Sequence, residues 1–156
     1  MTSRTLAARS REATLADVPE LVRLRLALMR SMHPVERPEE FCDTTARYLE
    51  RALVDGTFVA AVTESEGRLV ASSGMCLFLR LPLPESQAGL EGYVLNMYTE
   101  PEWRRRGLAR ELLHRLVEVA RARGVHRLWL HATEDGRRLY EDEGFCPNPS
   151  AMERLL

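Results

Sequence analysis

The sequence has no lysine, and all 22 of its basic residues are arginine. A mechanism that needs a lysine nucleophile, or a Schiff base on a lysine, is therefore excluded. The codon bias of a GC-rich genome accounts for this absence without any functional cause. The alternative is that the chain avoids modification of its own amines.

Cysteine is scarce as well. Cys42, Cys76 and Cys146 are odd in number, lie far apart and form no C-x-x-C pair. This spacing argues against a disulfide framework and against a zinc site. We therefore expect reduced thiols and no bound metal.

Long apolar runs are also missing. No stretch approaches the ~18 apolar residues that a membrane-spanning helix needs, and the start of the chain shows no signal-peptide pattern. We expect a cytoplasmic protein without a membrane partner.

An excess of charge of either sign is missing too. The formal net charge is −1, and charged residues make up 29% of a chain in which 45% of residues are hydrophobic. This composition is typical of a globular protein and argues against a general nucleic-acid binder. We expect one domain over residues 1–156, in which residues 1–9 are polar and flexible.

The most informative stretch covers residues 93–109. It starts as an apolar, β-prone run, turns at Pro101, and leads through a basic loop into a helical pattern. A helix N-terminus carries about half a positive charge and up to four unpaired N–H donors. The arginines at 104–106 add charge, and Gly107 lets the backbone approach a ligand closely. Together these features predict a site for a phosphorylated ligand.

The remaining elements follow from hydrophobic periodicity and turn residues. A strand at 11–13 precedes two helices, of which the first starts at a capping box formed by Asp17 and Glu20. Strands at 57–63 and 68–79 then form a hairpin. The predicted ranges are, for the helices, 17–32, 39–54, 108–123 and 136–143, and, for the later strands, 93–99, 125–132 and 152–156.

Hairpins join the middle strands and a helix joins the later ones. This order predicts an α/β fold whose mixed sheet begins antiparallel and ends parallel.

Two motifs resemble a known family. Arg104, Gly107 and Ala109 match the pattern [Q/R]-x-x-G-x-[G/A] at the start of a helix, and residues 139–145 match L-Y-x-x-x-G-F downstream. The sequence is therefore similar to the GNAT superfamily of N-acetyltransferases. The resemblance implies a GNAT-like twisted sheet with helices on both faces. It also implies that the fourth strand splays away from the fifth and opens a V.

The resemblance further implies acetyl-CoA as the acetyl donor, with no metal. The backbone of the 104–109 loop is expected to bind the pyrophosphate, and β-strand backbone at 97–99 to pair with the pantetheine arm and polarise the thioester. Thr133 stands where many relatives have asparagine, so its contact is shorter. The residues expected to bind acetyl-CoA are Met97, Tyr98, Thr99, Arg104, Arg105, Arg106, Gly107, Leu108, Ala109 and Thr133.

Catalytic residues follow less directly. Tyr140 matches the family tyrosine that protonates the departing CoA thiolate, although an aromatic of this kind also serves to pack the short helix. Tyr93 and Leu95 stand where family members place a base, and neither is a convincing one. Glu91 is expected to act as the base through water, or to be a solvated strand-end carboxylate. For His131 we expect a structural role.

We expect acetyl transfer to a primary amine, of a small amino-acid-like molecule first and of a protein or peptide second. The alternative is an acyl-CoA-binding regulatory module with little or no turnover, since no obvious base is present. A third hypothesis, a nucleic-acid contact through the arginines, is disfavoured by the near-neutral net charge. His33 and Glu36 lie in the loop between the first two helices, which either touches the acceptor or is a plain turn. Because only residues 146–156 follow Phe145, the acceptor pocket is expected to be open or completed by a second subunit in a homodimer.

Overall fold

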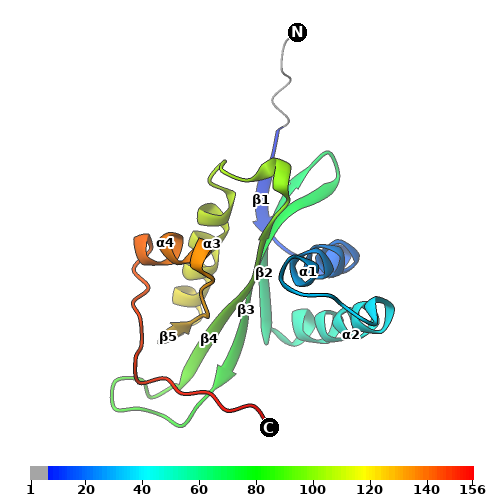
Figure 1. Ribbon diagram of the computed structural model, residues 1–156. Helices are drawn as coiled ribbons and strands as arrows, with labels where there is room; N and C mark the ends of the chain where they lie inside the picture. Colours follow the sequence, from blue (N-terminus) through cyan, green and yellow to red (C-terminus); the bar gives the residue numbers. More distant parts are fainter. Residues whose placement is uncertain (1–6) are drawn as a thin grey trace.

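The structure is a computed structural model that describes residues 7–156. It contains a five-stranded sheet in the order β1-β2-β3-β4-β5, with helices on both faces (Figure 1). Of the segment expected to be flexible, residues 1–6 lie outside the described residues, and Arg9 already belongs to the first strand. Within the described part, no helix has both the length and the apolar composition needed to cross a bilayer.

The elements follow the predicted order, apart from the last strand. Short 3-10 turns precede the first and third α-helices. The strands are β1 (Arg9–Glu12), β2 (Phe58–Ser65), β3 (Arg68–Leu79), β4 (Leu90–Thr99) and β5 (Arg127–Trp129), and the helices are α1 (Val18–Met32), α2 (Pro38–Asp55), α3 (Leu108–Ala122) and α4 (Glu134–Asp142).

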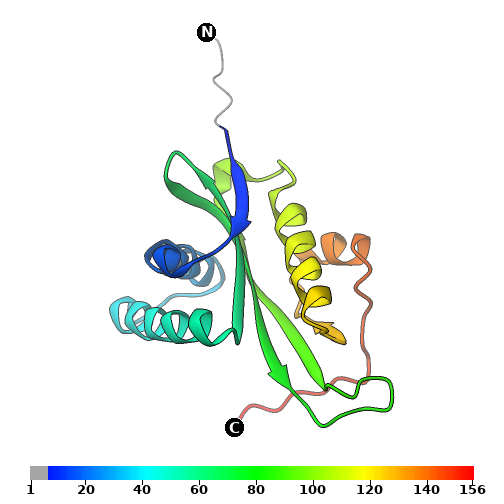
Figure 2. The same cartoon turned by 180° about the vertical axis from the view of Figure 1, so that it is seen from behind.

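The sheet divides two apolar cores. The helices α1 and α2 cover one face, and α3 and α4 cover the other, as the two opposite views show (Figures 1 and 2). Leu21 and Leu24 of α1 are fully buried against the first face, and Leu112 and Leu116 of α3 are fully buried against the second. The helical spacing of these leucines is what places each helix with its apolar side on the sheet.

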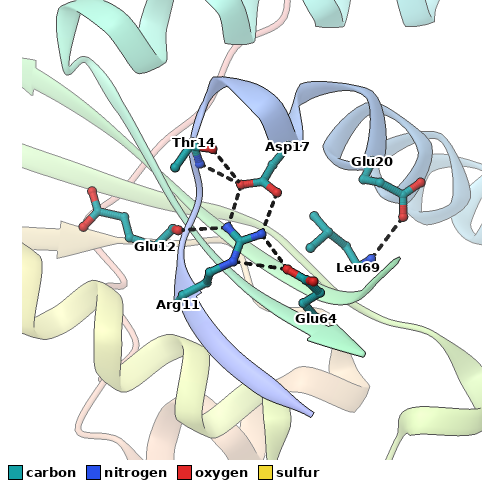
Figure 3. Close-up of polar contacts among 7 residues, drawn as sticks. All are labelled: Arg11, Glu12, Thr14, Asp17, Glu20, Glu64 and Leu69. Carbon is teal, nitrogen blue, oxygen red and sulfur yellow. Dashed lines mark hydrogen bonds and ion pairs between the residues drawn. The ribbon is translucent and has the colours of Figure 1, made fainter. Parts of the chain in front are cut away.

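The start of α1 differs from the predicted capping box. Asp17 accepts the backbone N–H of Thr14 at 2.7 Å and both guanidinium nitrogens of Arg11 at 2.7 and 2.8 Å (Figure 3). Glu20 does not reach back toward Asp17; its carboxylate accepts the backbone N–H of Leu69 at 3.1 Å (Figure 3). The prediction was wrong in its register: the capping box lies three residues earlier, where Asp17 reaches back to the Thr14 N–H, and Glu20 is occupied by Leu69 and Arg23.

The predicted change from antiparallel to parallel pairing is confirmed. β1 to β4 pair antiparallel, and β4 pairs parallel with β5 over three positions only, from Glu91 with Arg127 to Tyr93 with Trp129. β4 continues to Thr99 while β5 ends, so the two strands diverge (Figure 1). We call the opening between them the V, and its closed end lies at Tyr93.

Two strand predictions at the C-terminal end need correction. The strand expected at 125–132 is limited to Arg127–Trp129, because β4 has turned away and offers no partner beyond Tyr93. The strand expected at 152–156 does not form, and this segment has no regular secondary structure. Its apolar residues Met152, Leu155 and Leu156 are exposed, so the hydrophobicity that suggested a strand is not buried by sheet pairing.

Candidate functional site

The N-terminus of α3 is built as a cradle of free N–H groups. The first intrahelical bond runs from Glu111 N–H to the Gly107 carbonyl at 3.1 Å. The backbone N–H groups of residues 107–110 are therefore unused by the helix. Gly107 (φ 81°) and Arg105 (φ 63°) both adopt the left-handed conformation, which turns successive N–H groups inward and makes an anion-binding concavity. Leu108 and Ala109 form the first turn of the helix behind it.

Two of the three arginines in the loop, Arg104 and Arg106, hydrogen-bond to backbone carbonyls, and within the described residues Arg105 does not. Arg104 donates through Nε to the Thr99 carbonyl at 3.1 Å, and Arg106 donates to the Glu102 carbonyl at 2.9 Å. The Arg106 guanidinium also lies 4.6 Å from the ring centre of Trp103, a cation–π contact. Arg105 is exposed and makes no ion pair within residues 7–156. Their combined charge lies beside the cradle.

The edge of β4 that faces the V is open for pairing. Glu100 donates its N–H to the Val70 carbonyl of β3 at 2.9 Å. Because backbone groups of successive residues in a strand point to opposite edges, those of Thr99 point into the V. The Thr99 carbonyl agrees with this direction, because it accepts from the Arg104 side chain and not from β3. The open edge thus leads directly to the cradle.

A β-bulge in β4 helps to open the V. Ser72 pairs with Tyr98 and Gly74 with Leu95, so two β4 residues, Asn96 and Met97, oppose Ser73 alone. Asn96 takes the left-handed conformation (φ 59°), which asparagine tolerates better than most residues. An extra residue on one strand bends it. Sequence reasoning missed this feature, although an asparagine inside a β-prone run was the available signal.

Asn96 also carries a buried polar atom without a partner. Its side chain is 8% exposed, and its Oδ1 makes no hydrogen bond among the described residues. The hydroxyl of Ser73, which faces the bulge across the ladder, is in the same state. Both unpaired atoms therefore lie at the β-bulge, where the pairing of β3 with β4 is interrupted.

Tyr140 lies on the α3 side of the sheet, where α4 is tied to the cradle helix. Arg110 of α3 pairs with Asp142 at 3.0 Å and with Glu143 at 3.1 Å. The Tyr140 ring packs edge-on against Phe145, with centroids 5.9 Å apart. Burial raises the pKa of its hydroxyl, so the O–H stays protonated and able to donate. Among residues 7–156 that hydroxyl has no hydrogen-bond partner. The ring can therefore pack against Phe145 while the hydroxyl remains available to donate a proton.

Thr133 is the N-cap of α4 and is not a free side chain. Its Oγ1 accepts the backbone N–H of Gly136 at 3.2 Å, and the helix begins at Glu134, two residues before the predicted start. A hydroxyl retains a proton and a second lone pair after such a bond. A contact from Thr133 to a cofactor therefore stays a prediction.

Glu91 is buried and held by two donors. Its side chain is fully enclosed, and Trp129 donates its indole N–H to Oε2 at 2.5 Å. Arg80 adds an ion pair at 3.2 Å. Burial by itself raises the pKa of a carboxyl group, but the hydrogen bonds from Trp129 and Arg80 outweigh it and hold the pKa of Glu91 below its usual value. These contacts favour a structural ion pair over the predicted base.

Two further pairs lie on the α1 and α2 face of the sheet. The Tyr93 hydroxyl is 2.5 Å from Nδ1 of His131, so the histidine is not an isolated structural group. Cys76, which is opposite Tyr93 in the β3–β4 ladder, contacts the Tyr48 hydroxyl through its sulfur at 3.3 Å. Both pairs lie on the side of the V opposite α3. Sequence reasoning had named Tyr93 and His131 without connecting them.

Arg25 of α1 lies near this group as a half-buried cation. It has no carboxylate partner among the described residues. Burial lowers the pKa of its guanidinium, and the nearby Cys76 thiol opposes that shift. A guanidinium remains charged at neutral pH all the same. The loop residues His33 and Glu36 are exposed, and nothing places them next to Arg25.

The chain matches the model of the Acetyltransferase (GNAT) family over residues 19–145. An amino-acid acetyltransferase from Pseudomonas putida is 29% identical over 145 residues, which are 93% of this chain and 28% of that protein. A mycothiol acetyltransferase from Beutenbergia cavernae is 38% identical over 87 residues, which are 54% of this chain and 26% of that protein. The chain thus spans about a quarter of the length of these relatives.

Solved structures are similar over nearly the whole fold. A predicted acetyltransferase from Clostridium acetobutylicum, solved with acetyl-CoA, has a TM-score of 0.85 and 28% identity over 96% of both chains. A GCN5-related N-acetyltransferase from Ralstonia eutropha has a TM-score of 0.83 and 27% identity, over 96% of this chain and 99% of that one. These matches confirm the resemblance seen in the two motifs. The chain belongs to the Acetyltransferase (GNAT) family.

Proposed function

We propose that this protein transfers the acetyl group of acetyl-CoA to the primary amine of a small, amino-acid-like acceptor. The observation that carries the proposal is the continuity of the site: the open edge of β4 leads from the closed end of the V directly to the free N–H groups at the start of α3. An extended ligand with a phosphate group at one end matches that combination. Family membership and the Clostridium acetobutylicum structure with acetyl-CoA support it.

The cradle is assigned to the pyrophosphate. The N–H groups of residues 107–110 bind an anion through the helix dipole as well as through hydrogen bonds. Arg104 and Arg106 support this by holding the loop in its left-handed conformation. The backbone of Met97 and Thr99 pairs with the extended arm, and an N–H beside Tyr98 polarises the thioester carbonyl.

Tyr140 is assigned to the leaving group. The amine nitrogen forms a bond to the acetyl carbon, the carbon–sulfur bond breaks, and the electron pair goes to sulfur. A thiol pKa of about 8.5 makes the thiolate a fair leaving group, so the Tyr140 O–H needs only to donate its proton to it. Burial, which keeps that hydroxyl protonated, favours this role.

Arg25 supports an acceptor that carries a carboxylate. An unpaired guanidinium that is half removed from water favours an anionic partner, and a planar carboxylate matches its donor geometry. The relatives named amino-acid acetyltransferase act on a molecule of that class according to their name. An amino acid joins an amine and a carboxylate within a few bonds, which suits a compact acceptor site.

One observation favours the alternative function, an acyl-CoA-binding module with little turnover. Glu91, the carboxylate expected to act as base, is held in an ion pair with Arg80. A thiol-release assay over amino acids, their amides and short peptides, run beside acetyl-CoA calorimetry, separates the two. We expect binding with turnover, faster for amino acids than for their amides. Binding without turnover on any amine would favour the module, and no binding would exclude both functions.

A further inference from the structure

Tyr93 and His131 form a hydrogen-bonded pair across the closed end of the V. The Tyr93 hydroxyl lies 2.5 Å from His131 Nδ1, and the two ring centroids are 5.6 Å apart. Tyr93 belongs to β4, and His131 follows β5, so the pair joins the two arms of the V. The roles assigned above use neither side chain.

The position of the pair matches the place where the acceptor must arrive. Tyr93 is opposite Trp129, the last paired position of β4 and β5. The phosphate cradle follows the other end of β4, beyond Thr99. A donor whose phosphates lie in the cradle and whose arm runs along β4 therefore has its acyl end toward Tyr93. This geometry rests on the proposed function.

The reaction needs a proton acceptor at that place. An alkyl ammonium group has a pKa near 10.4, so at pH 7 only about one molecule in 2,500 carries the free electron pair that attacks. Glu91 is a poor acceptor, because Trp129 and Arg80 already stabilise its charged form. Tyr93 and His131 lie on the same face of the sheet as Glu91 and Trp129, and each is two residues further along its arm of the V.

We infer that Tyr93 and His131 form a proton relay that deprotonates the acceptor amine. The Tyr93 oxygen takes a proton from the ammonium group while its own hydroxyl proton passes to His131 Nδ1. The tyrosine ends neutral, the imidazole ends protonated, and the nitrogen gains its electron pair. His131 is exposed, so exchange with solvent then removes one proton from the imidazolium and returns the ring to the tautomer with a bare Nδ1. The step needs no further reagent.

The charges around Tyr93 favour a relay over a free phenolate. Burial raises the pKa of Tyr93, and the nearby Glu153 carboxylate and Cys76 sulfur raise it further, against a smaller lowering by the His131 backbone N–H. A phenolate is therefore disfavoured at neutral pH. A relay avoids it, because the phenol loses one proton as it gains another. Glu91, the remaining carboxylate on this part of β4, is neutralised by Arg80.

Two substitutions test the relay in the whole protein. Tyr93→Phe removes the hydroxyl and keeps the ring, and His131→Asn keeps an oxygen that accepts from Tyr93 but takes up no proton. With the best amino acid of the panel, we expect kcat/KM at pH 7 to fall about 100-fold in each, with unchanged acetyl-CoA affinity. The loss should shrink as the pH approaches the pKa of the acceptor amine, which is then already neutral. His126→Gln, which removes an exposed histidine just before β5, is the matched control.

A second measurement does not depend on the acceptor. Long-range proton–nitrogen NMR reports which ring nitrogen of a histidine carries hydrogen, and the chain has four histidines to assign. The relay requires His131 with a bare Nδ1 and a protonated Nε2, with a shift of the Nδ1 signal in Tyr93→Phe. The signal missing from His131→Asn identifies the residue.

The outcomes separate the relay from the proposed function. Full activity in both variants, a loss that does not vary with pH, or a hydrogen on Nδ1 would each overturn the relay and leave the acetyltransferase standing. A parent protein that binds acetyl-CoA but acetylates no amine would overturn both proposals. That result is recognisable because it appears before any substitution is made.

Discussion

Trp129 of β5 donates its indole N–H to the buried carboxylate of Glu91 in β4, two residues before β4 leaves its neighbour. This bond ties together the two strands that must separate further along to form the V, and Arg80, which directly follows β3, pairs with the same carboxylate. A buried carboxylate with two donors is costly to disturb, since removal of either donor leaves a charge that burial disfavours. Glu91 is therefore placed to hold the closed end of the V.

Glu91→Gln should reduce stability more than turnover. The amide keeps the size and the bond from Trp129 but loses the charge that pairs with Arg80, and we expect a loss of about 1–2 kcal/mol in the free energy of unfolding. We expect kcat/KM per folded molecule to change only a few-fold. Urea unfolding and the thiol-release assay measure the two effects, with Glu118→Gln on exposed α3 surface as control. A 100-fold loss of kcat/KM at unchanged stability would restore Glu91 as the base.

Tyr140→Phe should affect the chemical step alone. The ring keeps its packing against Phe145, and the hydroxyl has no partner among residues 7–156, so we expect stability to change by less than about 0.5 kcal/mol. Without the proton donor, kcat should fall about tenfold or more, while the acetyl-CoA dissociation constant measured by calorimetry stays constant. An unchanged kcat would assign Tyr140 to packing only.

The elements on each side of the site could be predicted because their signals are local. Gly107 and the arginines before it mark the start of α3 in any context, since an open helix end and a left-handed glycine depend on neighbouring residues only. The β-prone run at residues 68–79, which follows a hairpin turn, predicted the bounds of β3 correctly for the same reason. Sequence patterns over a few residues therefore suffice for elements whose bounds depend on neighbouring residues only.

The features that could not be predicted depend on partners far along the chain. Glu91 and Trp129 are 38 residues apart, so a solvated Glu91 carboxylate stayed an open alternative in the sequence, and the ion pair between Arg11 and Glu64 spans 53 residues. The strand expected at 125–132 had the right alternation, but a strand needs a neighbour to pair with, and β4 bends away. Periodicity indicates which residues are suited to burial, but it does not show whether a neighbouring strand is present to pair with them.

Stability should fall on acidification, and Asp17 should account for part of the loss. The hydrogen bonds from Arg11 hold the pKa of Asp17 below its usual value, despite the opposite effect of burial. The unfolded chain, with a pKa near 3.9, then binds a proton before the folded protein does. The stabilisation is complete above about pH 5 and is lost as the pH falls through 4 and below.

Asp17→Asn isolates this contribution. We expect a loss of about 1–2 kcal/mol at pH 7 and a flatter dependence of unfolding free energy on pH between about 5 and 3. Urea unfolding at a series of pH values provides the measurement. Asp43→Asn on the exposed face of α2 serves as control and should leave the curve in place. Parallel curves for the parent and Asp17→Asn would contradict the assignment.

Arg25→Gln should weaken the binding of acceptors that carry a carboxylate and should leave the binding of other acceptors unchanged. If the guanidinium binds that group, KM for an amino acid should rise more than tenfold, since a charge-assisted pair is worth roughly 1.5–3 kcal/mol. KM for the corresponding amide should stay within a few-fold of the parent value. Arg30→Gln, an exposed position on the same helix, should change neither. An equal rise in KM for the amino acid and its amide would indicate that Arg25 shapes the site but does not bind the carboxylate.

Gly107→Ala, compared with Gly124→Ala, should separate backbone strain from ligand binding. Both glycines have positive φ, 81° and 74°, and an added Cβ meets no atom within 4 Å at either position. Each substitution should therefore cost about 1 kcal/mol of stability through strain alone. Only Gly107 borders the free N–H groups of α3, so only there should the new methyl occupy ligand space. We expect acetyl-CoA affinity, measured by calorimetry, to fall more than tenfold in Gly107→Ala and to stay unchanged in Gly124→Ala. Equal affinities in the two variants would show that the phosphates do not approach the backbone at Gly107, and the cradle would then have to be placed elsewhere on the open edge of β4.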